Sequence, residues 1–242
     1  MNILLTNDDG YDAPGLRAAH NALAELGSVH VVAPKAERSA CGHSITLRGP
    51  ITVERVTHPD FEHCFAVDGS PADCVRLAVA ELIAPSLDLV VSGINYGANA
   101  GVDVFYSGTV AGAREGAIMG ITSIAISQAR RGGVETDWAA AGDFARFIAG
   151  ELLNEKLPGI GFWNVNLPAP IPENARNSIR RVPVATQPTP MKFDRVNQTD
   201  GRIMQYEYGA AYWTRDVPTP TDYSTMREGH IAVSAIPLTG QF

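Results

Sequence analysis

The chain has 242 residues, of which 45% are apolar and 19% are charged, and its formal net charge at pH 7 is −7. This is the composition of an ordinary globular protein, so neither a disordered chain nor a coiled coil describes the whole. Because the chain is acidic and has no basic run, it also lacks the electrostatic footprint of a protein that binds duplex nucleic acid.

The cysteines and the N-terminus bear on the cellular compartment. The number of cysteines is odd and no CxxC spacing occurs, so we expect reduced thiols at Cys41, Cys64 and Cys74. The N-terminus lacks the basic region and the long apolar run of a signal peptide. The sequence has no run of about 18 apolar residues, so no membrane span is predicted. We therefore expect a cytoplasmic protein that binds no membrane.

The chain begins with a pattern of strand, helix and strand. Residues 3–6 form a short apolar run that predicts a buried strand. Pro14 then opens a helical pattern that Gly27 ends, and a second strand is expected over residues 29–33, just before Pro34. This order is typical of two parallel strands joined by a right-handed crossover.

The alternation continues to the middle of the chain. Ser70 and Pro71 mark the start of one helix, as N-cap and first helical residue. We expect strands over residues 52–56, 65–67, 87–91 and 121–126, and helices over 70–83, 107–119 and 136–153. Alternating strands and helices predict an α/β fold with three layers.

The composition changes after Leu157. Ten of the 16 prolines lie in residues 158–242, and strand-like runs at 203–208 and 231–236 replace the alternation. We therefore expect a core over residues 1–157. The remainder is predicted to be a β-rich C-terminal extension, which belongs to the same domain or is exchanged between subunits.

Polar side chains follow several of the predicted strands. In an open α/β sheet, ligands bind outside the carboxyl ends of the strands. Asp8 and Asp9 follow the first strand, Ser39 follows the second, and Asn95 lies in a glycine-rich loop after a later strand. All four side chains offer oxygen, which favours a hard ion such as Mg²⁺ or Mn²⁺ over Zn²⁺.

A candidate anion site lies at the start of another predicted helix. Ser107, Gly108 and Thr109 open that helix, and its first backbone N–H groups have no partner within the helix. Together with the helix dipole these groups bind anions, and two hydroxyls beside a glycine suit a phosphate.

Each of these loops also has an ordinary structural explanation. Asp8 or Asp9 can cap the following helix from a solvated turn, and Ser107 can be a simple N-cap. Residues 38–44 and 92–99 can be plain small-residue loops. On the residues alone these alternatives stay open, and only the shared sheet edge favours a binding site. The sequence contains no GxxxxGK[ST], GxGxxG or GxSxG motif, so P-loop, dinucleotide-binding and serine hydrolase hypotheses lack support.

Five stretches in this order resemble the SurE family, the survival-protein-E phosphatases that act as 5′/3′-nucleotidases. They are ILLTNDDGYDAPGL (3–16), VVAPKAERSACGHSIT (31–46), VDGSPADCV (67–75), VVSGINYGANAG (90–101) and YSGTVAGAREG (106–116). The resemblance implies a Rossmann-like core, mainly parallel, whose β-rich extension forms a homodimer or homotetramer. It also implies a divalent-metal-dependent phosphomonoesterase that hydrolyses nucleoside 5′- and 3′-monophosphates, with short polyphosphate as a further candidate substrate.

The resemblance carries over to particular residues. It implies that one Mg²⁺ or Mn²⁺ ion per subunit is held by Asp8, Asp9, Ser39 and Asn95. Asp8 and Asp9 are also the expected catalytic residues, which orient an attacking water. The expected phosphate contacts come from Asn95, Ser107, Gly108 and Thr109.

Other hypotheses stay open at this level. An aspartate could form an aspartyl-phosphate, although families that do so usually have an Asp-x-Asp pair, and here the acids are adjacent. A phospho-acceptor receiver module would need a lysine at the end of a late strand, and none is well placed. A nucleotide-binding regulator without turnover is a third class. His230 is a candidate proton donor, with an ordinary core or surface histidine as the alternative.

Overall fold

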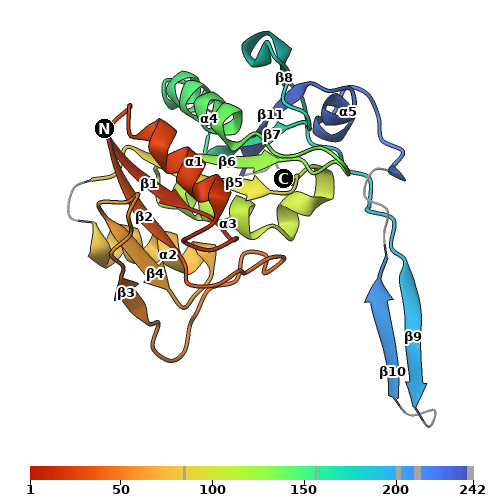
Figure 1. Cartoon of the computed structure of the whole chain (residues 1–242), viewed down its shortest axis with the longest axis horizontal. Coiled ribbons are helices and arrows are strands. Elements are labelled where there is room, and N and C mark those ends of the chain that lie inside the picture. The colour runs from red at the N-terminus through yellow and green to blue at the C-terminus, as the bar shows by residue number, and fades with distance from the viewer. Residues whose placement is uncertain (84–85, 156, 158, 200–202, 210–213, 239–242) are drawn as a thin grey trace.

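The predicted alternation builds a nine-stranded sheet at the centre of the protein (Figure 1). The structure is a computed structural model that describes residues 1–83, 86–155, 157, 159–199, 203–209 and 214–238. The strands of this sheet are β1 (Asn2–Thr6), β2 (Ser28–Pro34), β3 (Val53–Arg55), β4 (Cys64–Val67), β5 (Leu89–Tyr96), β6 (Thr122–Gln128), β7 (Gly161–Leu167), β8 (Ile179–Arg181) and β11 (Ile231–Pro237).

The strand order places the first strand near the middle of the sheet. It runs β3-β4-β2-β1-β5-β6-β7-β11-β8, and the six strands from β4 to β7 are mutually parallel. β3 and β11 run antiparallel to their neighbours β4 and β7. The prediction of an α/β fold with a mainly parallel sheet is therefore confirmed.

Helices cover both faces of the sheet. The helices are α1 (Pro14–Leu23), α2 (Pro71–Leu77), α3 (Gly108–Ile118), α4 (Trp138–Leu153) and α5 (Asp222–Arg227), with shorter helical turns η1 (Ala78–Leu82), η2 (Gly101–Phe105) and η3 (Ala175–Ser178). Ile3 and Leu5 pack with residues of α1 and α4, whereas Leu4 between them packs with residues of α2. Successive side chains of β1 thus point to opposite layers, as a strand buried on both faces requires.

Strand β7 was not predicted, and its polar side chains explain why. Asn164 and Asn166 are fully buried on one face of the strand, and the side-chain amide of each donates to the carbonyl oxygen of Asn99, at 2.8 and 3.0 Å. A buried polar group is tolerated when it is hydrogen-bonded. The asparagines therefore belong to the core, although they interrupt the apolar pattern that marks a buried strand.

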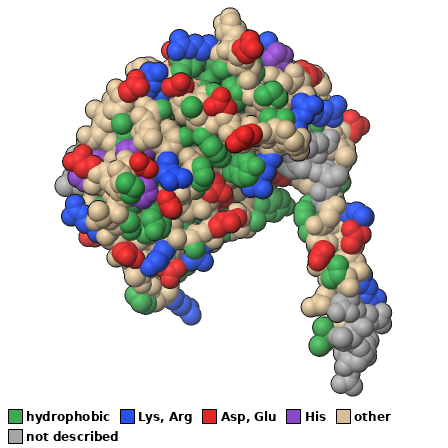
Figure 2. All heavy atoms as spheres, viewed as in Figure 1, with side chains coloured by type: hydrophobic (Ala, Val, Ile, Leu, Met, Phe, Trp, Pro, Cys, Tyr) green, Lys and Arg blue, Asp and Glu red, His purple; other side chains and the backbone are tan. Residues whose placement is uncertain are grey.

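The part of the chain after Leu157 has two structural roles. β7, β8 and β11 complete the central sheet. β9 (Phe193–Thr199) and β10 (Ile203–Tyr208) instead form an antiparallel hairpin that projects from the body of the protein (Figure 1). The hairpin exposes apolar side chains (Figure 2), among them Phe193, Ile203, Tyr206 and Tyr208. Among the described residues, no helix has the length and apolar character of a membrane span.

Candidate metal and phosphate site

The ends of three neighbouring strands bring the sequence-predicted site residues together. Asp8 and Asp9 follow β1, the loop after β2 carries Ser39, and Asn95 lies near the end of β5, while β2, β1 and β5 are adjacent in the sheet. The loop after β2 is joined to the aspartates because the Arg38 N–H donates to the Asp8 carbonyl oxygen at 2.7 Å. These links place the candidate metal ligands at one edge of the sheet.

Asp8 is in direct contact with the start of helix α3. Its carboxylate is buried and accepts a hydrogen bond from the Thr109 hydroxyl. A Cβ atom at Gly108 would lie 2.8 Å from the Cβ of Asp8 and 3.0 Å from the Sγ of Cys41, so only glycine leaves both side chains their places. The candidate phosphate turn and the first candidate metal ligand thus form one site.

The electrostatics of the two aspartates favour a cation. Burial is the main cause that raises the pKa of Asp8 to about 6. The hydrogen bond from Thr109 lowers this pKa, and the negative charge of Asp9 raises it further. Burial also raises the pKa of Asp9, against the Tyr96 N–H, which donates to its Oδ2 at 3.1 Å. In the part of the chain that the structure describes, neither carboxylate forms a salt bridge. Two carboxylates whose charge no salt bridge among the described residues neutralises, together with further oxygen donors, fit a hard divalent ion.

Ser39 and Asn95 have oxygen atoms that can join such a site. The Ser39 hydroxyl donates to Oε1 of Glu37 at 2.6 Å, so its oxygen keeps lone pairs for a cation. The Asn95 amide nitrogen donates to the Gly97 carbonyl oxygen at 2.7 Å. This bond fixes the orientation of the amide and leaves its oxygen, Oδ1, without a hydrogen bond among the described residues.

The phosphate turn is capped as predicted, but the Thr109 hydroxyl, one of its two, already donates to Asp8. The Ser107 oxygen accepts from the Val110 N–H at 3.0 Å, which makes Ser107 the N-cap of α3. The Thr109 hydroxyl donates to Asp8 and is completely buried. A phosphate at this turn would therefore meet the first backbone N–H groups of the helix and the Ser107 O–H rather than the Thr109 hydroxyl.

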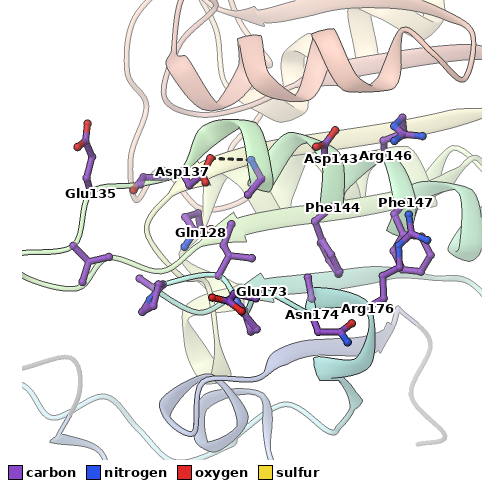
Figure 3. A pocket seen from close by; sticks show the side chains of 18 residues that line it. Gln128, Glu135, Asp137, Asp143, Phe144, Arg146, Phe147, Glu173, Asn174 and Arg176 are labelled. Carbon is purple, nitrogen blue, oxygen red and sulfur yellow. Dashed lines mark hydrogen bonds between the residues drawn. The ribbon is translucent and has the colours of Figure 1, made fainter.

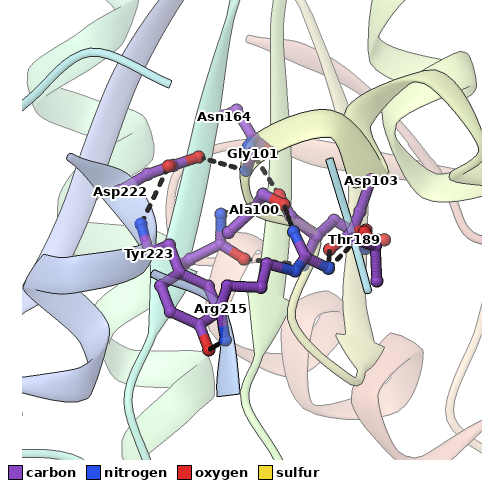
Figure 4. A network of polar contacts seen from close by, with 10 residues as sticks. Ala100, Gly101, Asp103, Asn164, Thr189, Arg215, Asp222 and Tyr223 are labelled. Atoms are coloured by element: carbon purple, nitrogen blue, oxygen red, sulfur yellow. Dashed lines mark hydrogen bonds and ion pairs between the residues drawn. The ribbon is translucent and has the colours of Figure 1, made fainter. Parts of the chain in front are cut away.

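Residues from the far end of the chain hold the segment before this turn (Figure 4). The Asp103 carbonyl oxygen accepts from the Ser107 N–H at 3.0 Å, and Nη2 of Arg215 donates to both oxygens of the Asp103 carboxylate at 2.8 Å. Asp222 accepts from the Gly101 N–H at 2.8 Å. The start of α3 is thus positioned by side chains more than a hundred residues later in the sequence.

The comparisons with known proteins agree with this geometry. The sequence model of the family described as survival protein SurE matches residues 3–192, which is more than half of the chain. The chain belongs to the SurE family. The resemblance stated from the sequence is thereby confirmed.

Relatives of this SurE family member match it over nearly its whole length. A 5′-nucleotidase SurE of Rhodopirellula baltica is 40% identical over 240 residues, which cover 98% of this chain and 92% of that protein. A 5′-nucleotidase SurE of Geotalea daltonii is 41% identical over 245 residues, or 98% and 93% of the two chains. The crystal structure of the SurE protein from Aquifex aeolicus aligns with a TM-score of 0.83 at 36% identity, covering 99% of this chain and 94% of that one.

The structure separates His230 from the other candidates of this SurE chain. His230 directly precedes β11, and β5, β6 and β7 lie between β11 and β1. Four strand spacings of about 4.8 Å place it roughly 19 Å from the end of β1. The geometry therefore supports the alternative of an ordinary histidine.

Sequence reasoning missed a second contact between the Ser39 loop and α3. Glu115 of α3 is buried, and its Oε2 lies 2.6 Å from Nε2 of His43, while Nη1 of Arg76 donates to its Oε1 at 3.0 Å. An acid within the small-residue pattern of the helix was a signal that Glu115 has a partner, because a buried carboxylate needs one.

Among the cavities at this sheet edge that the described residues form, two are compared with the candidate site. The larger, of ≈ 590 Å³, lies between α4 and the loop after β7 and contains none of the predicted site residues (Figure 3). The smaller, of ≈ 450 Å³, is lined in part by Asp9 and Glu37 and therefore adjoins the candidate site.

Proposed function

We propose that this SurE family member is a divalent-metal-dependent phosphomonoesterase that hydrolyses nucleoside 5′- and 3′-monophosphates to nucleoside and phosphate. The relatives named 5′-nucleotidase SurE, about 40% identical over nearly the whole chain, support this substrate class. One observation carries the proposal. Asp8, a buried carboxylate whose pKa is raised by burial, contacts the N-terminus of a helix at a position where only glycine fits.

We propose one Mg²⁺ or Mn²⁺ ion per subunit, with Asp8, Asp9, Ser39 and Asn95 as its ligands. The all-oxygen donor set and the raised pKa values of the two aspartates support this assignment. A divalent ion bound there supplies a Lewis acid and lowers the pKa of a coordinated water.

The chain's own residues then bind and orient the substrate. The backbone N–H groups of Gly108 and Thr109 and the Ser107 hydroxyl hold the phosphate, with the Asn95 side chain as a further contact. The Thr109 hydroxyl fixes Asp8 and the Tyr96 N–H fixes Asp9, so that either carboxylate can orient the attacking water. Preorganised donors of this kind stabilise charge that develops on the transferring phosphoryl group.

The assembly and location are part of the same proposal. We propose a homodimer or homotetramer formed through the β9–β10 hairpin, because its exposed apolar side chains are typical of a surface that a partner covers. We also propose a cytoplasmic location, which the three free cysteines support.

Phosphate release tests the proposal. Protein treated with EDTA should release no phosphate from a panel of 5′- and 3′-nucleoside monophosphates, and added Mn²⁺ or Mg²⁺ should restore turnover. Asp9→Asn should remove most of this turnover while the thermal unfolding temperature changes little. Asp12→Asn is the matched control, because Asp12 lies in the same loop with 66% of its side chain exposed. Undiminished turnover in Asp9→Asn would refute the assignment of Asp9 as a catalytic metal ligand. Labelled phosphate that stays on the protein after an acid quench would instead indicate a covalent aspartyl-phosphate route.

A further inference from the structure

A groove beside the candidate site has no role in the chemistry described so far. Its volume is ≈ 450 Å³, and its lining includes Asp9 together with the side chains of Tyr96, Arg130 and Trp138. We call it the aromatic groove. Its volume lies within the range of small-molecule sites. Because Asp9 forms part of its wall, a molecule whose phosphate lies at the candidate metal site can extend into it.

The groove presents flat side chains in fixed positions. The ring centroids of Tyr96 and Trp138 are 5.8 Å apart with an interplanar angle of 59°. The guanidinium carbon of Arg130 lies 4.0 Å from the centroid of the Tyr96 ring, and its Nε donates to the Tyr96 carbonyl oxygen at 2.7 Å. The same Tyr96 donates its N–H to Asp9. The stacking surface and the candidate catalytic carboxylate are therefore held by one residue.

Trp138 is positioned by the start of helix α1. A Cβ atom at Gly15 would lie 2.9 Å from Cζ3 of the Trp138 ring and 1.9 Å from the Ile94 carbonyl oxygen. Only glycine at this position lets the indole ring approach the helix so closely. The wall of the groove is thus built before a ligand binds, which reduces the entropy lost on binding.

Shape and charge together select the class of ligand. Nucleobases stack on aromatic side chains and on guanidinium planes, and each base has a flat face. The lining also carries three acids, Asp9, Glu37 and Glu135, against Arg130. This charge disfavours a second phosphate group and favours an uncharged nucleoside.

We propose that the aromatic groove binds the base of a nucleoside monophosphate, whose phosphate lies at the turn formed by Ser107 and Gly108. This proposal rests on the proposed function, since it names where the leaving nucleoside lies.

Substrate pairs test the groove. With Mn²⁺ present, Tyr96→Leu should lower the ratio of kcat/KM for AMP to kcat/KM for ribose 5-phosphate by roughly 5- to 150-fold, the effect of losing one stacking contact with a base. Tyr96→Phe should restore most of the ratio. Tyr96 is 43% exposed, so the leucine variant is expected to fold.

The larger cavity provides a matched control. There Arg176 lies 4.4 Å from the ring centroid of Phe147, an aromatic–guanidinium pair of the same kind (Figure 3). Phe147→Leu should leave the AMP to ribose 5-phosphate ratio unchanged. An equal fall of the ratio in Phe147→Leu and Tyr96→Leu would overturn the proposal.

Binding without turnover keeps the two proposals separable. Adenosine should quench the tryptophan fluorescence of the metal-free protein, and Trp138→Phe should abolish the quench. If quenching occurs but no phosphate is released with either metal, the proposed function fails and the groove proposal stands. If phosphate is released but Tyr96→Leu leaves the ratio unchanged, the groove proposal is overturned.

Discussion

Replacing Arg215 with methionine should destabilise the protein by about 3 kcal/mol. The Arg215 side chain is 1% exposed and the Asp103 side chain 18% exposed, and Nη2 of Arg215 lies 2.8 Å from both carboxylate oxygens. Removing one partner of a buried ion pair costs about 3–5 kcal/mol. We expect the lower end of that range because Asp103 retains some hydration and a hydrogen bond at 3.3 Å from the Thr189 hydroxyl.

Urea unfolding in EDTA measures this loss. Wild type, Arg215→Met, Asp103→Asn and the double variant form a double-mutant cycle, in which we expect a coupling energy of about 1.5 kcal/mol or more. Arg181→Met is the matched control. It breaks an ion pair with Glu155 whose side chains are 45% and 44% exposed, and such pairs contribute at most about 1 kcal/mol. An Arg215→Met protein within about 0.5 kcal/mol of wild type would refute the reasoning.

Three further predictions concern the site and the hairpin. In EDTA, stability should fall as the pH rises from 4 to 7, because the folded pKa of Asp8, about 6, exceeds its unfolded value of 3.8. The fall should reach about 3 kcal/mol, from roughly 2 pKa units, and Asp8→Asn should largely abolish it. Gly108→Ala should weaken Mn²⁺ binding, measured by calorimetry, because its Cβ would displace Asp8. Ile203→Glu should convert the proposed oligomer to monomer in light scattering, because Ile203 is 61% exposed on the hairpin that is proposed to form the interface.

Each of these three predictions would be contradicted by a specific result. Parallel pH profiles of wild type and Asp8→Asn would show that burial of Asp8 does not raise its pKa. Gly150→Ala serves as the control for Gly108→Ala, because a Cβ there meets nothing within 4 Å, and equal Mn²⁺ affinities of the two would contradict the steric argument. Leu47→Glu, an exposed apolar residue on the body, should leave the oligomer intact. An oligomer that survives Ile203→Glu would exclude the hairpin as its interface.

Local patterns were sufficient for five of the six parallel strands and for the strand-end loops. Residues 3–6 and 29–33 were recognised because buried parallel strands are continuous apolar runs, and their carboxyl ends define the edge where Asp8 and Ser39 lie. β7 was not predicted because Asn164 and Asn166 interrupt its apolar run. In the core, both side chains donate to the Asn99 carbonyl oxygen. Their partners are more than sixty residues away, and apolar periodicity contains no information about such pairs.

The residues that position the site could not be predicted either, because their partners are also far away in the sequence. Asp103 and Arg215 are separated by 112 residues, so nothing in either local sequence announces the pair. Glu115 and His43 are likewise brought together only by the packing of α3 against the loop after β2. A sequence pattern identifies groups that touch a ligand more readily than groups that hold those groups in place.

Described residues on either side of the projecting hairpin contact the same side chain. Thr189 precedes β9 and Arg215 follows β10, and both side chains meet on the carboxylate of Asp103 (Figure 4). A displacement of the hairpin would therefore move Asp103, whose carbonyl oxygen accepts from the Ser107 N–H. In the proposed oligomer, subunit association through the hairpin would therefore be linked to the geometry of the phosphate turn. We expect the specific activity to decline on dilution over the same concentration range in which the subunits separate.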